Sequence, residues 1–116
     1  MLTVKEGTIL INLVRKYAIT YLREGRKINF SLEAFERFSE RFGVFVTIRK
    51  EEDSKKNIIA CVGYPLPAIS LLQASLDATL SATIRARCFF KVGADELEDM
   101  IFEITILTPL ERIVVD

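Results

Sequence analysis

The feature of this sequence that most constrains its fold is a change in the spacing of apolar residues along the chain. Between residues 10 and 42, apolar residues recur every three or four positions, the spacing of one face of an α-helix. From residue 44 onward, short runs of β-branched and aromatic residues appear, and such residues favour strands. Helical stripes and short strands in one chain predict an α+β fold.

The first forty residues predict two helices. Thr3 and Glu6 occupy the positions of a capping box, and Gly25 supplies a stop at the far end of the first helix. Ser31 is a candidate N-cap of a second helix, which we expect to close at Gly43. An aromatic stripe at helical spacing is typical of core, so we expect this stripe to be buried. It consists of Leu32, Phe35, Phe38 and Phe42.

A third and longer helix is predicted from about Ala68 to Arg85. We expect an apolar patch, Phe89-Phe90, after this helix and then a short acidic turn at residues 93–96. Apolar residues at three- and four-residue spacing mark the core side of the helix. The opposite stripe is weakly polar and contains a single charged residue, which suggests that the helix is covered on more than one side. That outer stripe consists of Ser70, Gln73, Asp77 and Ser81.

Three apolar runs, residues 44–48, 58–62 and 101–107, have the length and composition of strands. In the last run, alternate residues lie on opposite faces of the strand. The charged run 49–57 cannot bury itself, so we interpret it as a turn that joins the first two strands into a hairpin. Residues 113–115 are also apolar and β-branched and are a candidate fourth strand. These segments predict an antiparallel sheet flanked by helices.

Composition bounds the size and the class of the protein. The chain has 116 residues, half of them hydrophobic, so we expect a single domain, residues 1–116, that folds without a disulfide or a metal. Sixteen basic residues balance sixteen acidic ones, which argues against nucleic-acid binding because such proteins carry a basic excess. The sequence shows neither a signal peptide nor a long apolar run. We therefore expect a cytoplasmic protein with no membrane partner.

The sequence contains no histidine, which removes the commonest general base and the commonest metal ligand. With only two cysteines, the chain alone cannot assemble a structural zinc site, and we expect no cofactor. Cys61 lies near the end of a predicted strand, where catalytic groups are often displayed. Its apolar neighbours instead favour an unreactive thiol packed in the core. Cys88 stands beside Arg87, a cation that could favour its thiolate.

Arg85 and Glu103 are charged residues in otherwise apolar stretches. Two interpretations are open. A buried charge must be paired, so these side chains could belong to structural ion pairs. Alternatively, a charge of this kind could anchor an anionic ligand in a cleft.

Several segments of the chain, taken in order, resemble the AMME chromosomal-region gene family. They are Arg41 to Thr47, Ala60 to Pro65, Ser81-Ala82 with Arg85, and Glu103 with Leu107-Thr108-Pro109. The resemblance covers nearly the whole chain. It implies an α+β fold with an antiparallel sheet flanked by helices and a cleft beside a smaller lobe.

The resemblance also implies which residues form a site. The positions that match the family's motifs are Cys61, Gly63, Tyr64, Arg85 and Phe89. Cys61 is thereby a candidate nucleophile, and the other four are candidate substrate-binding residues. The Arg-Gly that precedes the cysteine in the family is Ile59-Ala60 here. The family domain also continues beyond Pro109, so its second part is expected to be absent.

Two functions follow as alternatives. The first is a non-catalytic binding or assembly module. In the family, later strands complete the sheet, so without them the sheet would expose an edge, and self-association covers such edges. It predicts a homo-oligomer or a complex with another protein. The second is a small cytosolic thiol-dependent enzyme, with Cys61 as nucleophile and Arg85 as the anchor of an anionic substrate group.

Overall fold

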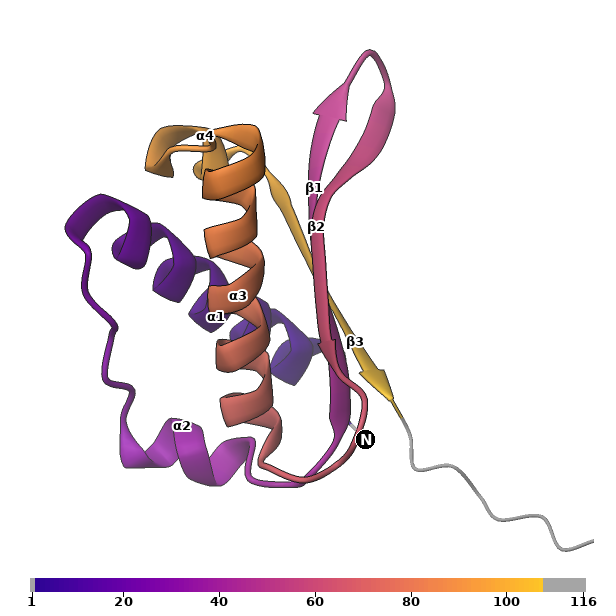
Figure 1. Ribbon diagram of the computed structural model, residues 1–116. Helices are drawn as coiled ribbons and strands as arrows, with labels where there is room; N and C mark the ends of the chain where they lie inside the picture. The colour runs from indigo at the N-terminus through magenta and orange to yellow at the C-terminus, as the bar shows by residue number, and fades with distance from the viewer. Residues whose placement is uncertain (1, 108–116) are drawn as a thin grey trace, which may run out of the picture.

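The computed structural model describes residues 2–107. The elements are α1 (Val4–Glu24), α2 (Leu32–Arg37), β1 (Gly43–Glu52), β2 (Lys55–Tyr64), α3 (Leu71–Phe90), α4 (Ala94–Glu98) and β3 (Ile101–Leu107). The strands form one antiparallel sheet in the order β2-β1-β3, and the helices lie on one side of it (Figure 1). The prediction of an α+β domain with an antiparallel sheet is confirmed. The candidate fourth strand, residues 113–115, lies outside the described residues.

α1 begins and ends where the sequence predicts. The Thr3 hydroxyl accepts a hydrogen bond from the Glu6 backbone N–H, and the Glu6 carboxylate accepts one from the Thr3 backbone N–H. Gly25 follows the helix with a φ of 69°, in the left-handed region that favours glycine. The inner face of α1 packs against α3. Burial there raises the pKa of Tyr17, and the nearby Asp77 adds to this effect.

α2 is shorter than predicted and buries less of its stripe. It ends at Arg37, and Gly43 begins β1 instead of closing the helix. Phe38 is fully buried, whereas Leu32 and Phe35 are exposed. The core prediction for the whole stripe is therefore wrong, because a helix of six residues has fewer than two full turns and cannot hold four stripe positions against the core.

The β1–β2 hairpin is longer than predicted. The charged residues continue the strand pairing out to Glu52 and Lys55, and only Asp53 and Ser54 form the turn. Both turn residues have positive φ, 50° and 66°, as in a tight two-residue hairpin turn. The prediction that residues 49–57 form the turn is wrong because charged side chains can remain in solvent while their backbone stays paired.

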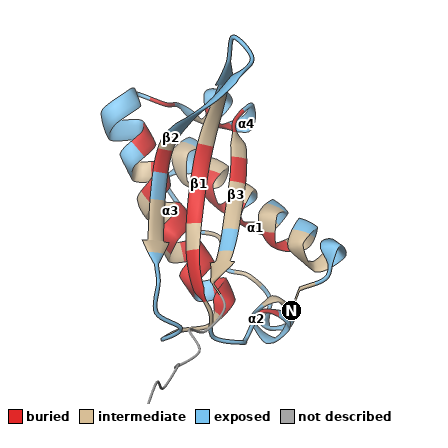
Figure 2. Cartoon of the chain, turned by 90° about the vertical axis from the view of Figure 1, so that its right-hand side faces the viewer, coloured by how far each residue is buried: buried red, intermediate tan, exposed pale blue. Residues whose placement is uncertain are grey.

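One face of the sheet forms the core with the helices. β1 is the central strand, and Val44, Val46 and Ile48 are all 0% exposed on the side toward α3. Alternate residues of β3 pair with them and share that face, as the sequence predicts. These residues are Phe102, Ile104 and Ile106. The opposite face carries no described helix or strand (Figure 2).

α3 packs against both the sheet and α1, in agreement with its weakly polar outer stripe. It begins later than predicted, at Leu71, and ends at Phe90. Phe89 and Phe90 therefore belong to its last turn and not to the segment after the helix. Residues 93–96, predicted as an acidic turn, instead begin the short helix α4.

We predict that Thr79→Val stabilises the fold. The hydroxyls of Ser75 and Thr79 are buried in α3 and have no hydrogen-bond partner among the described residues. Valine has nearly the shape of threonine without the unpaired hydroxyl, so the free energy of unfolding should rise by about 1 kcal/mol. Thr83→Val is the matched control, because the Thr83 hydroxyl donates to the Thr79 carbonyl at 2.7 Å. Urea denaturation measures the free energy of unfolding of the two variants. A Thr79→Val variant less stable than the wild type would contradict the prediction.

Candidate functional site

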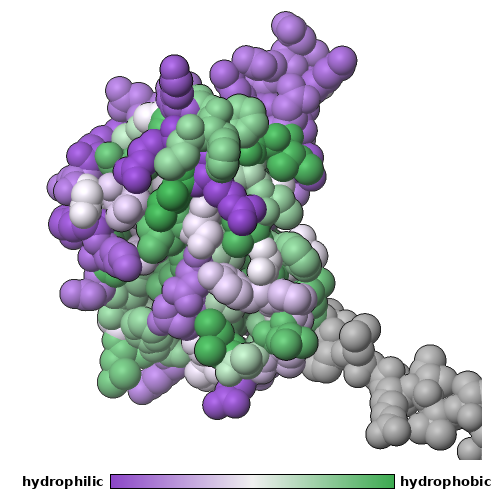
Figure 3. All heavy atoms as spheres, in the orientation of Figure 1, coloured by the Kyte–Doolittle hydropathy of each residue, from purple (hydrophilic) through white to green (hydrophobic). Residues whose placement is uncertain are grey.

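The predicted site residues gather along the free edge of β2. Among the described strands β2 pairs only with β1, and beside its other edge lies an open depression with a volume of about 730 Å³. The depression is lined by strand residues 58–61 and by Arg85, Phe89 and Phe90 from α3. The space-filling view shows hydrophobic residues just below the hydrophilic tip of the hairpin, beside the end of α3 (Figure 3).

A β-bulge shapes β2 at this depression. The pairing of β1 with β2 shifts by one residue between Ile48 and Arg49, so Ile59 has no partner on β1. A bulge bends its strand and increases the local twist. Beyond the bulge, residues 60–64 pair with β1 in a regular register, and their outer edge is correspondingly regular.

The same bulge decides where Cys61 points. Arg49 pairs with Ile58, and this register, continued without the shift, would place Cys61 opposite Val46 on the buried face. The shift pairs it with Thr47 instead, and the Thr47 hydroxyl donates a hydrogen bond to the Cys61 sulfur at 3.4 Å. Cys61 is exposed on the face of the sheet opposite α3, so its interpretation as a core thiol is wrong.

Arg85 and Glu103, the two charged residues of the apolar stretches, have different roles. The Glu103 carboxylate pairs with Arg49 Nε at 2.7 Å on the uncovered face of the sheet, as the ion-pair interpretation predicts. Arg85 is exposed and has no ion-pair partner among residues 2–107. It lines the same depression as Cys61 but approaches the strand edge from the opposite side of the sheet.

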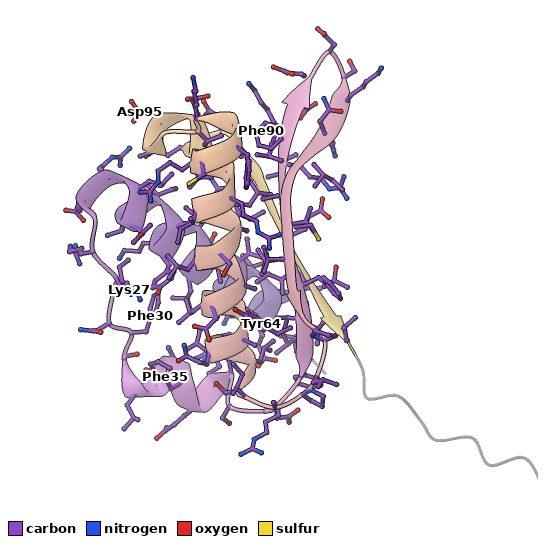
Figure 4. The ribbon with its side chains drawn as sticks, viewed as in Figure 1. Lys27, Phe30, Phe35, Tyr64, Phe90 and Asp95 are labelled. Atoms are coloured by element: carbon purple, nitrogen blue, oxygen red, sulfur yellow. The ribbon has the colours of Figure 1, made fainter. Side chains whose placement is uncertain are left out.

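The remaining predicted residues divide into two groups. Phe89 is 78% exposed and lines the depression beside Arg85. Gly63 lies beneath the ring of Phe45, its register partner on the uncovered face. Tyr64 is the last residue of β2 and lies far from Phe90, the last residue of α3 (Figure 4). The predicted residues that the depression brings together are Cys61, Arg85 and Phe89.

The depression offers a thiol, a guanidinium and an apolar wall, and no carboxylate from the described part of the chain lines it. It can therefore accept apolar side chains along Phe89 and an anionic group at Arg85. Among the residues that the structure describes, no three carboxylate or thiol side chains lie close enough together to hold a metal ion.

Thr47, Phe90 and strand residues 58–60 belong to the site but were not predicted as site residues from the sequence. A turn centred on residues 53–54 is the signal that could have indicated a strand pairing near Thr47 and Cys61. Even that turn would have placed Thr47 opposite Ala60, because the bulge changes the register by one residue. The sequence predicts Phe90 in an apolar patch after the helix, whereas Phe90 lies in the last turn of α3.

Comparisons with known proteins agree with this fold. A family model described as AMMECR1 matches residues 11–115. Protein MK0488 of Methanopyrus kandleri is 34% identical over 99% of this chain and 55% of its own length, and a protein of Methanosarcina acetivorans is 39% identical over 97% and 56%. The crystal structure of the uncharacterized protein PH0010 from Pyrococcus horikoshii matches with a TM-score of 0.73 and 25% identity, over 89% of this chain and 51% of that chain. The chain thus spans about half the length of these relatives.

We predict that Gly63→Ala destabilises the fold through Phe45. A Cβ atom at residue 63 would overlap the Phe45 ring, which must then move. The free energy of unfolding should fall by about 1–3 kcal/mol, the usual cost of overpacking. The same substitution should cost much less in a Phe45→Ser background. Urea denaturation of the two single variants and the double variant measures the coupling, and strictly additive costs would show that the ring does not occupy this position.

Proposed function

The chain belongs to the AMMECR1 family, and we propose that its fold serves as a non-catalytic binding and assembly module. The observation that carries this proposal is the free edge of β2 over residues 60–64, which no other described strand covers. Unpaired backbone N–H and C=O groups on an edge are a template for another strand. In this proposal a second copy of the chain supplies that strand, and the protein is a homo-oligomer.

The rest of β2 confines such pairing to this segment. Lys55 and Lys56 are exposed near the tip of the hairpin, and charged side chains on an edge discourage the addition of a strand. The bulge at Ile59 interrupts the regular edge between them and residues 60–64. The exposed Phe89 and Ile58 border the regular segment, so pairing there also covers apolar surface.

None of the described helices combines the length and the apolar content that crossing a bilayer requires. For the location of the protein, we propose the cytosol. Cys61 and Cys88 are both free and exposed, a state that a reducing compartment maintains.

A second candidate function is a small thiol-dependent enzyme. The observation that favours it is that Cys61 and Arg85 line one depression. In this hypothesis Cys61 is the nucleophile and Arg85 holds an anionic group of the substrate. No carboxylate among residues 2–107 lines the depression to act as a base, and for this reason the assembly module is the better supported function.

We predict that association depends on Phe89. At tens of micromolar, where a specific interface of standard size should hold, light scattering should show the wild-type chain as a dimer or a larger species. Phe89→Glu should weaken association because it places a charge beside the pairing edge. Leu32→Glu is the matched control, since Leu32 lies on α2 and is 74% exposed against 78% for Phe89. A wild-type monomer at this concentration would contradict the assembly proposal.

A comparison of the two cysteines tests the enzyme hypothesis. The assembly module predicts that Cys61 in a Cys88→Ser variant is alkylated at about the same rate as Cys88 in a Cys61→Ser variant, because both thiols are exposed. The enzyme hypothesis predicts that Cys61 reacts about tenfold faster or more at neutral pH, because a nucleophilic thiol is activated by a nearby cation. It further predicts that Arg85→Gln removes the difference. Equal rates would exclude an activated Cys61.

A further inference from the structure

The outer side of α3 carries two charges of opposite sign, Asp77 and Arg85. Among residues 2–107 neither of them forms an ion pair. Asp77 accepts a hydrogen bond from the amide of Gln73 at 2.8 Å, within the same helix. The third charged residue of α3, Arg87, lies over the ring of Tyr21 at 5.6 Å. Asp77 and Arg85 are therefore the charges of α3 that remain available to a partner.

These two charges are placed symmetrically along the helix. Asp77 lies four residues before Ser81, and Arg85 lies four residues after it, a distance of about 6 Å along the axis in each direction. When two identical helices pack antiparallel about a twofold axis at Ser81, the residue four positions before the axis on one helix meets the residue four positions after it on the other. Asp77 of each copy then lies across from Arg85 of the other copy.

The free edge of β2 indicates the same axis. α3 runs antiparallel to β2 (Figure 1), and Arg85 from the helix and Ala60 from the strand line the same depression. Ser81 lies four helical residues before Arg85, which is about 6 Å along α3. Val62 lies two strand residues after Ala60, which is also about 6 Å along β2 and in the same direction. Val62 is the midpoint of the regular edge, residues 60–64. Antiparallel pairing of two β2 edges about Val62 therefore centres the two α3 helices near Ser81.

The packing of α3 allows both contacts at once. α3 lies over β1 and β2, close to the free edge. Strands in a sheet are about 5 Å apart, so pairing two edges brings two such helices to about the 8–10 Å at which helices pack. The small side chain of Ser81 at the axis suits this close approach. The strand edge and the helix face are therefore both self-complementary, and a second copy of the chain can contact both at once.

We infer that this chain forms a symmetric dimer in which residues 60–64 of the two β2 strands pair antiparallel and Asp77 of each α3 helix forms an ion pair with Arg85 of the other copy. The inference rests on the self-association proposed above and specifies its geometry. The reciprocal pattern of charge is the reason that the partner is a second copy, because the surface matches itself after half a turn.

Charge reversal in the full chain tests this geometry. Asp77→Arg sets two cations across from each other, and Arg85→Glu sets two anions across from each other, so each should weaken dimerisation by about tenfold or more in a sedimentation dilution series. The double variant restores both pairs with their signs exchanged and should return the dissociation constant close to that of the wild type. Glu36→Arg and Lys27→Glu, which reverse exposed charges outside α3, should change nothing. Circular dichroism establishes that each variant is folded.

Mixing the two single variants gives a sharper result. In a mixed dimer, each reversed residue meets an opposite charge on the other copy, so the mixture should associate more tightly than either variant alone. A dimer that neither reversal weakens, or that mixing does not restore, would overturn this geometry and leave self-association standing. A monomeric wild type would overturn both proposals.

Discussion

Burial of the central strand beneath α3 is the interaction on which the rest of the structure depends. β1 is hydrogen-bonded on both sides, and its side chains toward the helices are removed from water. Each buried valine or isoleucine of this kind contributes roughly 1.5–3 kcal/mol. α3 faces the strand with small residues, among them Ala78, Ala82 and Ala86, all fully buried, which allows the helix to approach the sheet closely. α1 packs against a further side of α3 and leaves the stripe of Gln73, Asp77 and Ser81 partly exposed.

A sheet covered on one face has to protect the rest of its surface by other means. On the uncovered face, contacts between neighbouring strands provide this: the Phe45 ring covers Gly63, Thr47 binds Cys61 and Arg49 pairs with Glu103. The free edge of β2 has no comparable cover among the described residues. Because Cys61 and Arg85 border this edge, a strand added there would enclose both side chains. The two proposed functions, assembly and thiol chemistry, would therefore compete for one surface.

The sequence predicted best those features that act over a few residues. The capping box of Thr3 and Glu6 and the stop at Gly25 bound α1 correctly, because each signal operates within one helical turn. Alternation within residues 101–107 likewise predicted that Phe102, Ile104 and Ile106 share one face of β3. Predictions failed where the outcome depends on a partner far along the chain. The charged arms of the hairpin remain strands because each pairs with the other, and α2 ends at Arg37 with none of its own residues buried.

By itself the sequence determined the fold class, the bounds of the first helix, and the lack of histidine chemistry, since these follow from residue types and short-range spacing. It also singled out Cys61, Arg85 and Phe89. Only the tertiary structure decided that these three border one free strand edge, that Glu103 pairs with Arg49, and that Cys61 is exposed. The physical reason is the strand register. A single bulged residue, Ile59, moves Cys61 from the buried face to the uncovered one, and no pattern within the strand itself reveals that shift.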